Sequence, residues 1–128
     1  MSLAENVSNI MQSAHQCKML ADGGVAINTH CLYPSNGMVQ VIVRSAGDVF
    51  FVSDDGGAIR EALSAGAAFT KSMDNKLSAI ATNQGLIFNN GIISAPRLPI
   101  ESIAAAVILV ANASKEMADR IFSAHRVR

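Results

Sequence analysis

The chain has 128 residues, of which half are apolar, and it carries ten basic and ten acidic side chains. This length suits one domain with a sizeable core, and a charged fraction of 16% is too low for a disordered chain. The formal net charge of zero gives no overall attraction to nucleic acid or to an anionic membrane. We therefore expect a single folded domain, residues 1–128, whose partners are neither nucleic acid nor a membrane.

The start of the chain and its cysteines are typical of a cytoplasmic protein. The opening MSLAEN lacks the basic and apolar regions of a signal peptide, and it leaves open whether Ser2 and Leu3 are native. The longest apolar run, 103–111, is shorter than the roughly 18 residues that cross a bilayer. Cys17 and Cys31 have neither CxxC spacing nor the density of a disulfide framework, so we expect two reduced thiols, with a single bridge as the alternative.

The first half of the chain predicts a helix followed by three strands. Apolar residues at spacings of three and four indicate an N-terminal helix that ends at Asp22-Gly23-Gly24: Val7, Ile10, Met11, Ala14 and Cys17. Strands are expected over 25–32, 38–43 and 49–53, where apolar residues alternate or run together. Because the turn sequences YPSNG and SAGD lie between them, we expect an antiparallel meander.

The second half predicts two helices and a hairpin. A short helix should end near Gly66, and a second should run from about Ser72 to Gly85. Asn90-Gly91 between two apolar runs favours a hairpin with a type I′ turn, which needs positive φ at both positions. In that register one face of the hairpin carries Leu86, Phe88, Ile93 and Ala95.

The last helix is expected to follow Pro99 and to run from Ile100 to about Ala124, close to 37 Å at a rise of roughly 1.5 Å per residue. Its middle, IAAAVILVA, is apolar on all sides. Either the helix is buried between the sheet and other helices, or its surplus face meets a second copy of the chain. We favour a homodimer, because exposed apolar patches usually mark an interface. The residues expected at that interface are Ile103, Val107, Ile108 and Val110.

Taken in chain order, these elements predict a single α+β domain with the order α-β-β-β-α-α-β-β-α. The strands, a three-stranded meander plus a hairpin, are expected to form one mostly antiparallel sheet packed with helices.

The stretch VFFVSDDGGAIREAL, residues 49–63, leads an apolar strand into two acids, two glycines and a helix. One interpretation is a Mg²⁺ site formed by Asp54 and Asp55, with Glu61 nearby. The other is a bend in which an aspartate accepts the free N–H groups of the first helical turn, with glycine allowing the change of direction. Neighbouring strand residues point to opposite faces, so the pair does not converge on one ion unless the turn twists. We favour capping and keep the metal site as the alternative.

Polar residues on or beside the first two strands are Thr29, Asn36 and Gln40. They either line a groove for a ligand or partner, or form the ordinary polar face of a half-exposed sheet. For Tyr33, before Pro34, we expect packing within the turn. The sequence contains no GxSxG, phosphate-binding loop or zinc spacing, so we expect no cofactor and predict no catalytic residue.

The segment THCLYPSNGMVQVIVRSAGDVFFVSDDGGAIREALSAG, residues 29–66, is followed by GLIFNNGIISA and by AAAVILVAN. In these motifs and their order the chain resembles a small bacterial and phage family, domain of unknown function family 1828. The matching positions are Thr29, Gln40, Asp54, Asp55 and Gly56. Where that family has a proline and two aspartates, this chain has His30, Tyr33 and Gly37. The resemblance implies a bacterial or prophage-encoded, cytoplasmic protein and no particular activity. If the family's acids formed a divalent-metal site, half of it is missing here.

The function expected from these patterns is a non-enzymatic, dimeric protein-binding module. The alternative is a metal-dependent hydrolase or nuclease, intact or degenerate, built on Asp54 and Asp55, so whether the chain is an enzyme stays open. Three arginines near the C-terminus are typical of a solvated tail rather than of a nucleic-acid contact: Arg120, Arg126 and Arg128.

Overall fold

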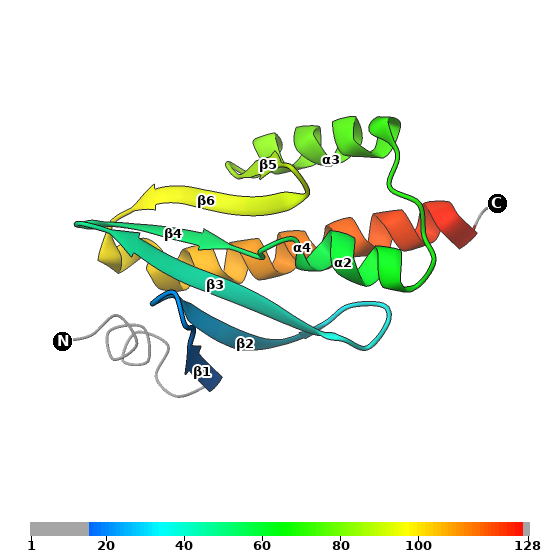
Figure 1. Ribbon diagram of the computed structural model, residues 1–128. Helices are drawn as coiled ribbons and strands as arrows, with labels where there is room; N and C mark the ends of the chain where they lie inside the picture. Colours follow the sequence, from blue (N-terminus) through cyan, green and yellow to red (C-terminus); the bar gives the residue numbers. More distant parts are fainter. Residues whose placement is uncertain (1–15, 127–128) are drawn as a thin grey trace.

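Six strands form one antiparallel sheet in the computed structural model, which describes residues 16–126 (Figure 1). The strands lie in the order β1-β2-β3-β4-β6-β5. Their bounds are β1 Gln16–Met19, β2 Val25–Leu32, β3 Met38–Ala46, β4 Val49–Ser53, β5 Ile87–Asn89 and β6 Ile92–Leu98. The described helices are α2 Gly57–Ser64, α3 Lys71–Asn83, the short 3-10 helix η1 Ile100–Ser102, and α4 Ile103–Arg126. The predicted α+β class with a mostly antiparallel sheet is confirmed.

Strands β2, β3 and β4 form the predicted meander. β3 pairs with β2 on one side and with β4 on the other. Val39, Val41 and Val43 are fully buried on one face of β3, as their period of two requires. β3 continues to Ala46, three residues beyond the predicted end, because its last residues pair with the start of β4.

The hairpin β5–β6 has the predicted turn and register. Asn90 and Gly91 both have positive φ, 53° and 79°, and Phe88 lies opposite Ile93. The hairpin also joins the meander, because β6 pairs antiparallel with β4. This second pairing places β6 directly beside the end of β4, where the two adjacent aspartates follow.

Helix α4 lies along one face of the sheet and contacts four of its strands (Figure 1). Helix α2 lies beside α4, and α3 lies next to β5. The buried side of α4 fills the core against the sheet with residues that are at most 1% exposed: Ile103, Val107, Val110, Met117 and Ile121.

The predicted dimer interface needs correction at three of its four positions. Ile103, Val107 and Val110 lie in the core of their own chain, because the sheet and α2 already cover that side of α4. Ile108 is 56% exposed and remains available to a second copy. Most of the apolar middle of the helix is therefore explained by burial within one chain.

The predicted N-terminal helix does not extend to Asp22. Residues 16–19 form strand β1, in which Cys17 lies opposite Ile27 of β2. The edge of β2 offers backbone partners to the side of these residues that faces it, and this pairing outweighs the helical spacing of Cys17. A turn closed by the Leu20 N–H donating to the Gly24 carbonyl, at 2.7 Å, then leads into β2. The other predicted helix residues, Val7, Ile10, Met11 and Ala14, lie outside the described residues.

Two further expectations bear on the setting of the protein. Cys17 and Cys31 are free and half-buried, so the alternative of a single bridge between them is wrong. Within residues 16–126 there is no helix with the length and apolar character that crossing a membrane requires.

Candidate functional site: the bend between β4 and α2

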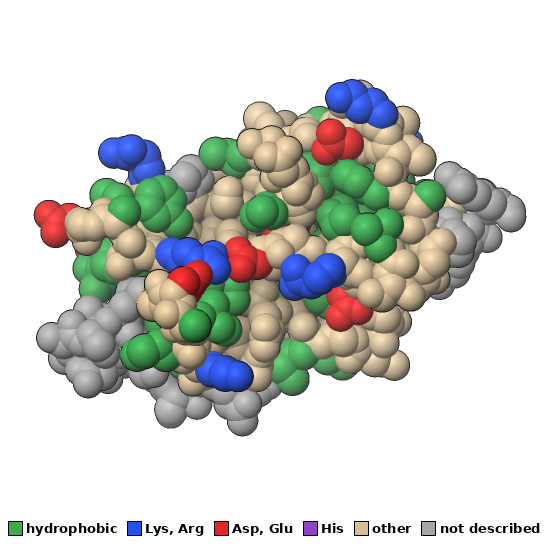
Figure 2. Space-filling model, viewed as in Figure 1, with side chains coloured by type: hydrophobic (Ala, Val, Ile, Leu, Met, Phe, Trp, Pro, Cys, Tyr) green, Lys and Arg blue, Asp and Glu red, His purple; other side chains and the backbone are tan. Residues whose placement is uncertain are grey.

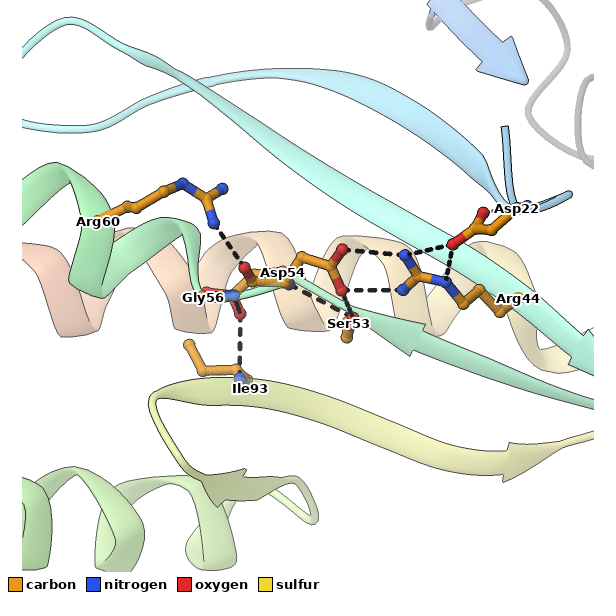
Figure 3. Close-up of polar contacts among 9 residues, drawn as sticks. Asp22, Arg44, Ser53, Asp54, Gly56, Arg60 and Ile93 are labelled. Carbon is orange, nitrogen blue, oxygen red and sulfur yellow. Dashed lines mark hydrogen bonds and ion pairs between the residues drawn. The ribbon is translucent and has the colours of Figure 1, made fainter. Parts of the chain in front are cut away.

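The chain bends sharply between the end of β4 at Ser53 and the start of α2 at Gly57. Two consecutive residues have left-handed backbone conformations, Asp55 with φ 51° and Gly56 with φ 80°. Glycine adopts this conformation freely, and aspartate is among the few other residues that tolerate it. As a result the side chains of Asp54 and Asp55 meet different partners: Asp54 accepts the N–H of Ile93 in β6 (Figure 3), and Asp55 pairs with Arg44 of β3.

Asp54 is 2% exposed, and both of its carboxylate oxygens accept hydrogen bonds from the protein. Oδ1 accepts from the N–H groups of Gly56 at 2.9 Å and Ile93 at 3.0 Å. Oδ2 accepts from the N–H of Ala58 at 3.3 Å and from the hydroxyl of Ser114 at 2.7 Å. One side chain thus joins β4 to β6, α2 and α4.

These contacts confirm the capping interpretation in a modified form. The carboxylate of Asp54 accepts an N–H group from the first turn of α2, as an N-cap does. The N-cap position itself is occupied by Gly56, which has no side chain, so Asp54 reaches the helix from two residues earlier. The left-handed backbone of the two intervening residues makes this reach possible.

The hydroxyl of Tyr33 lies 2.7 Å from Ser114 Oγ. Because the Ser114 hydroxyl donates its hydrogen to Asp54, Tyr33 is the donor in this second bond. The three residues therefore form a buried chain, which we call the Tyr33–Ser114–Asp54 chain. Burial is the main reason why the pKa of Tyr33 is raised, to about 12.

Glycine is required where Tyr33 meets the start of α2. A Cβ at position 57 would stand 2.5 Å from the Tyr33 hydroxyl oxygen, closer than any packing allows. Tyr33 also closes the turn between β2 and β3, where its N–H donates to the Gly37 carbonyl at 2.8 Å. The expected packing within the turn holds only for the backbone of Tyr33: its side chain is 3% exposed and lies in the core, where its hydroxyl meets Ser114 of α4.

Asp55 lies on the outer side of the bend. Its carboxylate forms a two-pronged ion pair with Arg44 of β3, at 2.9 and 3.1 Å, and accepts the Ser53 hydroxyl at 3.0 Å. The Arg44 guanidinium also binds Asp22, 3.1 Å away (Figure 3). The hydrogen bond from Arg44 is the main reason why the pKa of Asp55 lies below its usual value. The pKa of Asp22 is lowered first by the N–H of Gly24 and then by Arg44.

The predicted metal site does not form, because the two carboxylates do not converge. The oxygens of Asp54 are filled by four protein donors, and those of Asp55 face Arg44. A cation at either acid would have to displace these donors. Across residues 16–126, His, Cys, Asp and Glu side chains nowhere gather in a group of three or more that could hold a metal ion.

A cavity of about 270 Å³ opens beside the bend, between the β2–β3 hairpin and α2. Its lining residues are Tyr33, Met38, Gln40, Asp54, Gly57, Arg60, Glu61 and Ser64. Figure 2 shows the molecule from the side on which the strands lie in front of α4, with basic and acidic side chains close together on the surface.

The three predicted groove residues do not act together. Gln40 lines the cavity, and its side-chain amide donates to Asn28 at 2.8 Å. Thr29 is 8% exposed and donates its hydroxyl to the Val39 carbonyl, within the irregular pairing of β2 and β3. Asn36 is exposed in the turn, with φ 70°. Only Gln40 keeps a place in the candidate site.

Ser114 is the site residue that the sequence interpretation missed. It is fully buried on α4 and lies one turn from Val110 and one turn from Met117, both core residues. A hydroxyl within an apolar helical stripe needs a buried partner, and this is the signal that points to it.

In comparisons with known proteins, no family model, no curated protein and no solved structure matches the chain. The resemblance to family 1828 therefore stays a prediction. Asp54 is one of the matching positions, and it meets Tyr33, which replaces a family aspartate, through Ser114. Gly37, which replaces the other aspartate, lies against Glu61 of the cavity. Asp55 faces away from them.

Proposed function

We propose that the chain is a non-enzymatic, bacterial or prophage-encoded binding module that acts as a homodimer on a protein partner. The geometry of the bend supports a non-catalytic role for its acids, because both carboxylates of the Asp-Asp pair are engaged in holding the fold together. The homodimer is proposed because apolar side chains are exposed on the outer side of α4, opposite the side that forms the core.

Two adjacent apolar side chains are exposed near the middle of this outer side. Ile108 is 56% exposed and Leu109 is 39% exposed, although the opposite side of the same helix forms the core. Exposed residues recur at spacings of three and four from η1 into α4, which places them in one stripe: Glu101 of η1, and Ala105, Ile108, Asn112 and Lys115 of α4. We call this set the outer stripe.

The outer stripe is complementary to itself. Glu101 lies about two turns before Ile108, and Lys115 lies about two turns after it. If two copies cross antiparallel at Ile108, the Glu101 carboxylate of each copy faces the Lys115 ammonium of the other, as a twofold interface requires. Ala105 is small, so it allows the two helices to approach closely. We therefore propose a second copy as the occupant of this stripe.

The size of the apolar contact sets the expected affinity. Two apolar side chains from each copy form a smaller core than the roughly 1,200–2,000 Å² of a standard stable interface. We expect a dissociation constant on the order of micromolar, about −8 kcal/mol.

The test is the molar mass by size-exclusion chromatography with light scattering across a concentration series. The wild type should approach twice its 13.4 kDa at high concentration. Ile108→Glu should stay at the monomer mass, because it places a charge in the apolar contact. Leu63→Glu is the matched control, since Leu63 is similarly exposed, at 53%, but lies on α2. A wild type that stays monomeric at every concentration would falsify the proposal.

Charge reversal tests the antiparallel register. Glu101→Lys should weaken the dimer about tenfold, because it brings two like charges together. The double variant Glu101→Lys with Lys115→Glu should restore the wild-type association. If Glu101→Lys dimerises as well as the wild type does, the proposed crossing at Ile108 is wrong.

A further inference from the structure

The cavity beside the bend carries opposite charges on one wall. Arg60 and Glu61 are consecutive residues of α2, and both line the space of about 270 Å³. Met38, which is 45% exposed, contributes an apolar thioether from β3. A cavity with a cation, an anion and an apolar side chain on its walls suits a ligand that has the same three features.

The charged groups of Arg60 and Glu61 are held in place by protein contacts and retain hydrogen-bonding capacity for a ligand. Arg60 Nη1 donates to the Asp55 carbonyl at 2.7 Å, which fixes the guanidinium. Among the described residues, its second terminal nitrogen has no hydrogen-bond acceptor. The free edge of a fixed guanidinium is a good partner for a carboxylate.

Glu61 is fixed in a similar way from the other side. Its Oε2 accepts the Ser35 hydroxyl at 2.9 Å, and its carboxylate packs against Gly37, where a Cβ would collide with it. A carboxylate has about four acceptor positions, so Glu61 retains acceptor capacity for an ammonium group.

The cavity floor has no vacant hydrogen-bonding group that would compete for the ligand. Tyr33 donates to Ser114, and the oxygens of Asp54 are filled by their four donors. The charge selectivity of the cavity therefore rests on Arg60 and Glu61, while Gln40 and Ser64 add uncharged polar groups to its lining.

We propose that this cavity binds a free α-amino acid with an apolar side chain, held by its carboxylate at Arg60 and its ammonium at Glu61. At roughly 30 Å³ for each water-sized group, the volume accommodates about nine such groups, the size of leucine or methionine. The apolar side chain of the ligand packs against Met38. This inference is independent of the proposed homodimer.

The experiment is a thermal unfolding series on the full chain with leucine and methionine at about 10 mM. For a dissociation constant of about 1 mM, the melting temperature should rise by about 3–5 °C. Isoamylamine lacks the carboxylate of leucine, and 4-methylpentanoate lacks its amine, so each should raise the melting temperature by less than about 1 °C. The proposal is overturned if leucine and methionine give no shift, or if either half-ligand gives the same shift as leucine.

Substitutions in the cavity test whether the rise in melting temperature comes from binding there. Arg60→Gln and Glu61→Gln should each weaken leucine binding at least about tenfold by calorimetry, since each removes one charge partner. Glu61→Gln can keep the bond from Ser35, so its unliganded melting temperature should stay near that of the wild type. Arg97→Gln, an exposed arginine on β6 outside the cavity, is the matched control and should bind like the wild type.

The dimer variant separates this inference from the proposed function. Ile108→Glu, which should be monomeric, should still bind leucine with wild-type affinity because Ile108 does not line the cavity. Unchanged binding by both Arg60→Gln and Glu61→Gln contradicts the amino-acid site and leaves the dimer proposal intact.

Discussion

The inner and outer sides of the bend use the same residue type in opposite ways. On the inner side, Asp54 is 2% exposed and accepts four hydrogen bonds from three other elements and from the bend itself. On the outer side, its neighbour Asp55 forms an ion pair in which both side chains are more than a third exposed. The difference teaches that the stabilising effect of a carboxylate depends on whether its hydrogen-bond donors could bond to water if the carboxylate were removed.

Water is an available substitute only on the outer side. A buried donor that loses its acceptor costs about 1–3 kcal/mol, whereas an exposed ion pair contributes about 0–1 kcal/mol. We therefore expect substitutions on the inner side to lower the free energy of unfolding much more than those on the outer side.

The largest effect is expected for Asp54→Ala. It leaves the N–H groups of Gly56, Ala58 and Ile93 and the Ser114 hydroxyl without their acceptor, so the free energy of unfolding should fall by about 3–5 kcal/mol. Urea unfolding measures this change. Asp54→Asn is the matched control and should lose less, because its amide keeps one accepting oxygen. A loss below about 1 kcal/mol for Asp54→Ala would remove the distinction between the two sides.

An intermediate effect is expected for Tyr33, the single tyrosine of a chain without tryptophan. Ultraviolet absorbance during alkaline titration should give a pKa of about 12 in the folded protein, against about 10 in denaturant. Because the folded pKa is the higher one, the stabilising contribution is complete below pH 10. It is lost as the pH rises from 10 to 12.

Tyr33→Phe is the control for this titration. It should cost about 1 kcal/mol at neutral pH, because Ser114 loses one partner, and it should remove the tyrosine's share of the decline between pH 10 and 12. A folded-state pKa near 10 for Tyr33 would show that its hydroxyl meets water rather than Ser114.

The smallest effect is expected for Asp55→Asn. Arg44 keeps its contact with Asp22, so the free energy of unfolding should fall by no more than about 1 kcal/mol at neutral pH. The pKa of Asp55 is lowered in the folded state, so its contribution is present above about pH 4 and is lost as the pH falls further. Added salt should shrink the difference between variant and wild type. A loss as large as that of Asp54→Ala would contradict the comparison.

Local chemistry made much of the fold predictable. Asn90-Gly91 allows few turns other than type I′, and the alternating valines of β3 leave one choice of buried face. The N-terminal register was not predictable in this way, because residues 16–19 become a strand only when the edge of β2 is beside them. Local spacing contains no information on that distant partner.

The candidate site was predictable in its chemistry and not in its geometry. An aspartate before glycine and a helix indicates a cap, and one of the two acids has that role. Which acid turns inward depends on the left-handed conformations of Asp55 and Gly56, and Tyr33 and Ser114 join it from remote parts of the chain. The pairing of β6 with β4 and the docking of α4 bring these parts together.

The contacts of Asp54 also determine which parts of the chain can unfold separately. Its partners Ile93 and Ser114 are 39 and 60 residues away in the sequence, and Tyr33 is 81 residues from Ser114. Contacts between residues so far apart in the sequence form late in folding. In the native protein they break only when most of the molecule unfolds with them. The amide hydrogens of Ala58 and Ile93 should therefore exchange with deuterium only through global unfolding. The elements that meet at this junction are expected to unfold as one cooperative unit.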